Sequence, residues 1–157
     1  MQNHRVVVTG LGVCSPNGVG VPAFKKALEQ GKSGIRFYSE LKKLKFSCQI
    51  GGMPLISEAV KSKYFTPLQL RNFNASGILY GVAAGVEAWQ DAGLAIDEER
   101  CDFDSGTIFG VGTLGVDKYR ESIYKVDEGN TRRLGSTSVQ QTMSSGVSAY
   151  LGGMLGL

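Results

Sequence analysis

The hydrophobic pattern is clearest between Pro67 and Asp91, where it predicts one long helix. No proline occurs from Leu68 to Asp91, and apolar side chains recur there in steps of three and four, as on one face of a helix. These residues are Ala75, Ile78, Val82, Val86 and Trp89. Positions with almost no side chain lie beside that stripe, namely Gly77, Gly81, Ala84, Gly85 and Ala88. Each glycine costs a helix about 1 kcal/mol relative to alanine, so we expect this helix to be buried against a closely packed element.

The chain after this helix predicts a strand and a tight turn. Gly93 suits the left-handed residue that commonly follows a helix. Asp102–Gly110 (DFDSGTIFG) predicts a strand that enters a core. Val111–Gly115 (VGTLG) predicts a turn at which the backbone approaches a neighbour closely.

Shorter patterns predict the flanking elements. Arg5–Leu11 (RVVVTGL) is β-branched and apolar on both faces, which is typical of a central strand covered by helices, and a dense turn signal follows it. Thr66 and Pro67 are expected to begin the long helix as its N-cap and first residue. The other expected elements are helices at Pro22–Gln30, Ser57–Tyr64, Val116–Val126 and Val139–Leu155, short strands at Gly34–Phe37 and Phe46–Ile50, and a loop at Asp127–Ser138.

Composition narrows the class of protein. The chain has 157 residues, of which 42% are hydrophobic and 20% charged, as in a globular domain. A net charge of +3 is too small to indicate nucleic acid, and no apolar run is long enough for a membrane span. Three cysteines without C-x-x-C spacing favour neither a disulfide framework nor zinc. We therefore expect a cytoplasmic protein without a metal or other cofactor.

The last residues, Ser148–Leu157 (SAYLGGMLGL), are nearly all apolar. A chain terminus is usually polar and exposed, so we expect residues 1–157 to be the amino-terminal part of a longer protein. The alternative is a C-terminal helix that docks under the core.

The motifs that suggest chemistry are incomplete. Gly110, Gly112 and Gly115 match G-x-G-x-x-G, but the acidic residue that a dinucleotide site needs about 20 residues later is not preceded by a strand pattern. His4 is the only histidine and is interpreted as an exposed terminal side chain, so no Ser–His or Cys–His pair can be built. Cys14 follows a strand pattern, yet no neighbouring cation would lower its pKa, so it is interpreted as a small buried hydrophobe.

Basic residues gather near the starts of the two helices expected to be buried. They are Lys61, Lys63, Arg71, Arg132 and Arg133. Such a patch favours an acidic partner, which its charge would steer and orient. Ordinary solvated surface is the other interpretation.

Five segments in order resemble the amino-terminal part of the β-ketoacyl-acyl-carrier-protein synthases, the elongating condensing enzymes of fatty-acid and polyketide synthesis. They are RVVVTGLGVCSPNG (5–18), GKSGI (31–35), GVAAGVEAWQDAGL (81–94), TIFGVGTLG (107–115) and MSSGVSAYLGGMLGL (143–157). Each is weak alone, but together they span the chain.

The resemblance implies a fold and a chemistry. The fold is the amino-terminal half of a thiolase-like αβαβα layered α/β fold, which the family assembles as a homodimer. The chemistry is decarboxylative condensation of an acyl group with malonyl-carrier protein, through a cysteine nucleophile and two histidines. Because that cysteine would follow a segment like residues 147–157, this span ends before it and is expected to be inactive alone.

The resemblance also implies binding residues. The glycine turn borders the acyl tunnel, which makes Gly112 and Thr113 candidates for contact with the growing acyl chain. Met143, near the start of the last helix, is expected to reach the partner subunit's tunnel. Acyl carrier protein is acidic, and its docking face is expected at Lys61, Lys63, Arg71 and Arg132.

Two other interpretations of the function stay open. A non-catalytic chain-length-factor-type subunit, paired with an active synthase as a heterodimer, would have the same fold. A nucleotide-binding domain is the weaker of the two. Acyl preference is also open, because the family often has a proline-and-aromatic loop where this chain has Ser136–Ser138.

Overall fold

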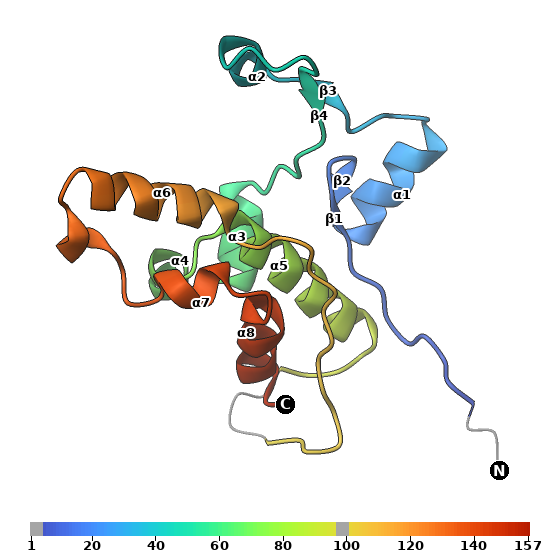
Figure 1. Cartoon of the computed structure of the whole chain (residues 1–157). Helices are drawn as coiled ribbons and strands as arrows, with labels where there is room; N and C mark the ends of the chain where they lie inside the picture. Colours follow the sequence, from blue (N-terminus) through green and yellow to red (C-terminus); the bar gives the residue numbers. More distant parts are fainter. Residues whose placement is uncertain (1–4, 97–100) are drawn as a thin grey trace.

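The computed structural model describes residues 5–96 and 101–157 as a body of helices with a protruding hairpin (Figure 1). The first part contains β1 (Cys14–Ser15), β2 (Gly18–Val19), α1 (Val21–Glu29), β3 (Arg36–Phe37), α2 (Ser39–Lys43) and β4 (Ile50–Gly51). The helical body then follows as α3 (Glu58–Tyr64), α4 (Pro67–Asn72), α5 (Ser76–Asp91), α6 (Val116–Asp127), η1 (Thr131–Arg133), α7 (Ser138–Thr142) and α8 (Gly146–Leu155).

Helix α5 is the centre of the core, as its pattern predicted. Ile78, Val82 and Val86 are buried and belong to the same cluster as Leu151 of α8. The small-residue face is also confirmed: a Cβ added at Gly81 would lie 2.5 Å from Val147, and one at Gly85 would lie 2.6 Å from Leu151. The glycines of α5 therefore let α8 pack closely against it.

A second segment packs on other small residues of α5. Gly10 and Gly12 lie so close to the backbone of Ala88 and Ala84 that a side chain at either glycine would meet a carbonyl oxygen of α5. The Leu11 amide donates to the Asp91 carboxylate at 2.9 Å. Backbone contact and a carboxylate together fasten the N-terminal segment along the helix.

The expected long helix at residues 67–91 is wrong, because α4 and α5 are separate helices. Thr66 and Gln69 form a capping box at the start of α4, which confirms the expected N-cap. The separation at Phe73–Ala75 has a physical reason: the Asn74 and Ala75 amides donate to the Gln141 side chain instead of to carbonyls one turn earlier. A partner distant in sequence therefore stabilises the corner.

The expected helix at residues 139–155 is likewise divided into α7 and α8. Met143 is extended, with a ψ of 140°, and ends α7. Other predictions are confirmed with small shifts of boundary, namely α1, α3, α6 and the Gly93 helix end, whose φ is +74°.

The strands expected at residues 5–11 and 102–110 are not formed in the described part of the chain, whose strands are two-residue pairs. The expected strands at 34–37 and 46–50 are reduced to β3 and β4. Strands need hydrogen-bonded neighbours, and both missing strands are strongly exposed: Val6 is 91% accessible and Ile108 is 99% accessible. Figure 1 draws both segments as plain traces beside the helices. Within the described residues, no helix is long and apolar enough to cross a membrane.

Candidate functional site

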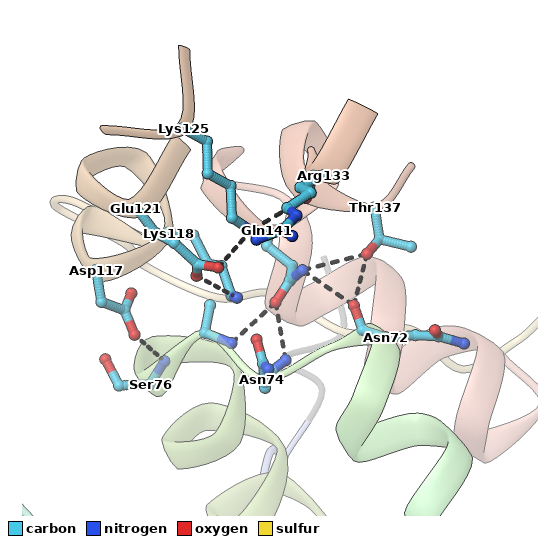
Figure 2. Close-up of polar contacts among 11 residues, drawn as sticks. Asn72, Asn74, Ser76, Asp117, Lys118, Glu121, Lys125, Arg133, Thr137 and Gln141 are labelled. Carbon is cyan, nitrogen blue, oxygen red and sulfur yellow. Dashed lines mark hydrogen bonds and ion pairs between the residues drawn. The ribbon is translucent and has the colours of Figure 1, made fainter. Parts of the chain in front are cut away.

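A buried glutamine holds the corner between α4 and α5 against α7 (Figure 2). The Gln141 side chain is only 3% exposed, and its Oε1 accepts from the Asn74 amide at 2.8 Å and the Ala75 amide at 2.9 Å. Its Nε2 donates to the Asn72 carbonyl at 3.0 Å and to the Thr137 hydroxyl at 3.2 Å. Thr137 in turn donates to the same Asn72 carbonyl at 2.5 Å. We call Gln141, Thr137 and the backbone of Asn72–Ala75 the glutamine clamp.

The glutamine clamp shares Asn72 with the lining of an apolar cavity of about 650 Å³ between α4 on one side and α7 and α8 on the other. Phe73 lines it from the α4–α5 corner, and Met143 lines it from the α7–α8 junction. Phe73 also packs edge-to-face on Tyr150, with ring centroids 4.9 Å apart. The lining contains no charged side chain; its other members are Leu68, Gln69, Asn72, Gln140, Ser145, Gly146, Ala149, Gly153 and Met154. Such a cavity suits an uncharged apolar group.

The structure places the expected acyl-contact residues in two groups. Met143 lines the cavity and is half exposed. Gly112 and Thr113 are exposed and are not among the lining residues. Their turn nevertheless reaches the same region, because Gly115 packs against the backbone of Gln141 and Thr142. The joint role of Gly112, Thr113 and Met143 stays a prediction.

The expected carrier-docking residues are also divided. Arg71 lines a polar cavity of about 240 Å³ together with Lys118, Lys125 and Arg133. Arg132 lies beside Arg133 in η1 and is exposed. The patch therefore has a basic centre between α4, α6 and η1.

The other two docking candidates have partners of their own. Lys61 is 2.7 Å from Glu58 in an exposed ion pair on α3, and it lines a separate cavity that also holds Asp117 and Glu121. Lys63 donates to the Tyr64 hydroxyl at 3.1 Å and lies over its ring. Neither lines the Arg71 cavity.

Glu121 lines both of these cavities and forms ion pairs with two lysines. Both Lys118 and Lys125 donate to its carboxylate at 2.6 Å, which lowers the pKa of Glu121 to about 2. Because the folded pKa lies below the ordinary value of 4.5, this contribution to stability is complete above about pH 4.5 and is lost as the pH falls toward 2. The site is well solvated, so the contribution is small.

Cys14 lies in β1 next to a carboxylate that holds the N-terminal segment. The Glu87 side chain accepts from the Val13 amide at 2.9 Å and from the Val21 amide at 2.8 Å. Burial and then the charge of Glu87 raise the pKa of Cys14 to about 11. The thiol is therefore protonated at neutral pH, as expected for a packing residue and not for a nucleophile.

Alkylation of the native chain should separate the three cysteines. At pH 8 we expect iodoacetamide to modify the exposed Cys48 and Cys101 at least about tenfold faster than Cys14, because the thiolate is the reactive form. Peptide mass spectrometry after timed quenching measures the three rates, and the difference should vanish in urea. Equal rates in the native chain would contradict the burial of Cys14.

Within the described residues, the glycine motif of residues 110–115 ends at the start of helix α6. No group of three or more His, Cys, Asp or Glu side chains is placed in the described part of the chain to hold a metal. A Cβ built at Gly112 would have no atom within 4 Å, and Gly115 is the N-cap of α6. His4 lies outside the described residues.

Sequence patterns did not reveal the polar residues that hold the site together. Gln141 and Glu87 both bind backbone amides more than 60 residues away. Asp117 similarly accepts from the Ser76 amide at 2.9 Å. The sequence held only weak signals for these residues. Gln141 interrupts the apolar pattern of residues 139–155, and Glu87 and Asp91 are the acidic residues of α5, which is otherwise rich in small residues.

The chain has clear relatives among known proteins. The family described as "Beta-ketoacyl synthase, N-terminal domain" matches residues 3–157. The 3-oxoacyl-[acyl-carrier-protein] synthase 2 of Vibrio harveyi is 33% identical over the whole chain, which spans 37% of that relative. The chain therefore spans a little over a third of such curated relatives.

Solved structures agree in fold. A β-ketoacyl synthase from Burkholderia phymatum STM815 superposes with a TM-score of 0.77 at 22% identity, covering 99% of this chain and 38% of that one. A type II polyketide ketosynthase, solved in complex with its acyl-carrier protein and bound to the hexaketide, superposes with a TM-score of 0.68. It is 25% identical, with 99% of this chain and 36% of that chain covered.

Proposed function

The chain belongs to the β-ketoacyl synthase family, and from this we propose that it forms the amino-terminal part of a condensing enzyme that joins an acyl group to malonyl-carrier protein with loss of CO2. The fold is the amino-terminal half of the thiolase-like α/β architecture. In the proposal, residues 1–157 supply a pocket wall, and the nucleophilic cysteine belongs to sequence that follows them. The enzyme would act in the cytoplasm as a homodimer.

The observation that carries the proposal is the apolar surface that this chain leaves exposed. The chain spans only 37% of a curated relative in the same family. Residues 5–11 contain a run of three valines, of which Val8 is 81% exposed, and Ile108 of the other unformed strand is 99% exposed. Helix α8 buries Val147 and Leu151 against α5 but leaves its other side to the apolar cavity. A second half that supplied sheet neighbours would cover such surfaces.

The basic centre supports acyl carrier protein as the partner. Arg71 and Arg133 line one polar cavity, and Arg132 is adjacent. Exposed charges of one sign speed encounter with an acidic surface and orient it. The carrier-bound polyketide relative is similar to this chain in fold. Lys61 and Lys63 stay in the proposed docking face as its outer members.

Condensation by the complete polypeptide tests the proposal. Incubated with acyl-carrier and malonyl-carrier protein, it should release CO2 and yield β-ketoacyl-carrier, which intact-protein mass spectrometry detects. Residues 1–157 alone should neither form an acyl adduct nor release CO2. An acyl adduct on the isolated 157 residues would contradict the assignment of the nucleophile.

The chain-length-factor alternative gives a different result in the same assay. That subunit would be inactive alone and would change the product length only when combined with an active synthase. Activity of the complete polypeptide by itself eliminates this alternative.

A further inference from the structure

The glutamine clamp connects the two walls of the apolar cavity. One wall follows the α4–α5 corner, where Phe73 lies directly between the clamped residues Asn72 and Asn74. The other wall follows the α7–α8 junction, where Met143 is two residues from Gln141. Any movement of one wall relative to the other must therefore strain or break the hydrogen bonds of Gln141.

The glutamine clamp is well suited to fixing the distance between the α4–α5 corner and α7. Both polar atoms of the Gln141 side chain are engaged, two bonds to each atom, and only 3% of the residue is exposed to water. A buried amide that loses these partners leaves backbone groups unsatisfied, which is costly. Figure 2 shows the side chain pointing between Asn72 and Thr137 on one side and Asn74 on the other.

The turn before α6 also packs against the end of α7, next to the α7–α8 junction. Gly115 packs against the carbonyl of Gln141 and the Cα of Thr142. The turn that contains Gly112 and Thr113 is thereby fixed to the same two residues. Gln141 is thus two residues from Met143 and lies against Gly115, which ends the turn of Gly112 and Thr113, although its own side chain does not line the cavity.

We propose that Gln141 is a positioning residue that sets the width of the cavity between Phe73 and Met143, and so determines which acyl chain length the enzyme accepts. This inference rests on the proposed condensing activity. The ligand class is an uncharged alkyl or polyketide tail, because the lining contains no charged side chain. Gln141 does not touch the acyl chain and acts through the placement of Met143.

Two variants change the clamp to different degrees. In Gln141→Glu the carboxylate still accepts from the Asn74 and Ala75 amides but cannot donate to the Asn72 carbonyl, so only the α4 side is released. Thr137→Val keeps the shape of the side chain and removes the bonds of one hydroxyl. Gln90→Leu is the control, since Gln90 is an exposed glutamine of α5 outside the cavity.

The experiment uses the complete polypeptide and a series of acyl-carrier donors from short to long. We expect Gln141→Glu to change the ratio of kcat/KM between the longest and shortest accepted donors by about fivefold or more, Thr137→Val by about twofold, and Gln90→Leu not at all, as for small changes in pocket dimensions. A merely structural role would lower kcat/KM for every donor by one factor and leave the ratio unchanged.

The outcomes separate the inference from the function on which it rests. An unchanged ratio in folded variants of an active enzyme overturns the role of Gln141 and leaves the proposed function standing. If circular dichroism shows that Gln141→Glu does not fold, the donor ratio of Thr137→Val decides the question alone. A wild-type protein without condensation activity defeats the proposed function, and the inference is rejected with it.

Discussion

Gly115→Ala is expected to destabilise the chain by about 3 kcal/mol or more, because two separate penalties act at this residue. Gly115 has a φ of +64°, a left-handed conformation that an L-residue adopts at a cost of about 1 kcal/mol. An added Cβ would also meet the Gln141 carbonyl oxygen and lie 3.0 Å from the Cα of Thr142. Backbone atoms cannot rotate away, so α7 would have to shift. The midpoint of urea unfolding, followed by far-UV circular dichroism, measures the loss.

Gly129 provides a matched control at the other end of the same helix. Its φ is +72°, but no atom lies within 4 Å of a Cβ built there. Gly129→Ala should therefore incur the conformational penalty alone, about 1 kcal/mol. Equal losses in the two variants would show that α7 does not pack against Gly115 in solution.

Local signals in the sequence were sufficient for the helices and their ends. The three-and-four spacing located α5, and the small residues on its face correctly indicated close backbone packing. Thr66 and Gly93 behaved as capping residues, as local backbone chemistry requires. Such predictions succeed because the interactions that decide them lie within one turn.

The errors arose where distant partners decide the structure. Periodicity alone continued α4 into α5, yet Gln141, 66 residues from Ala75, stabilises the break. The apolar runs at 5–11 and 102–110 have strand composition, but a strand also requires a hydrogen-bonded neighbour. The described residues supply helices and loops beside these runs and no neighbouring strand.

In the candidate site, too, local sequence signals predicted some features, whereas others depend on partners distant in sequence. Met143, expected near the start of the last helix, lies at the α7–α8 junction and lines the apolar cavity, and its contact with an acyl chain stays a prediction. The basic centre between Arg71 and Arg133 could be anticipated from charge, whereas the pairing of Lys61 with Glu58 depends on side-chain placement. Gln141 carried no motif, because its partners are backbone groups that any sequence provides.

Glu87→Gln is expected to cost about 2–3 kcal/mol and to release the N-terminal segment from α5. One carboxylate oxygen of Glu87 accepts from the Val13 amide and the other from the Val21 amide. An amide side chain can accept through its oxygen alone, so its NH2 group would face a backbone N–H. Glu29→Gln is the control, because Glu29 is exposed and its nearest cation, on Lys25, is 3.9 Å away; it should change stability by less than about 0.5 kcal/mol.

A second readout of Glu87→Gln is the reactivity of Cys14. Burial is the main cause of the raised pKa of Cys14, and the charge of Glu87 adds to it. Removing that charge and loosening the segment both lower the pKa, so Cys14 alkylation should accelerate and its pH profile should move to lower pH, while Cys48 and Cys101 keep their rates. If unfolding free energy and Cys14 reactivity both match the wild type, the carboxylate does not hold the segment. If stability falls but Cys14 stays slow, the segment is held to α5 by the glycine contacts at Gly10 and Gly12 even without the carboxylate.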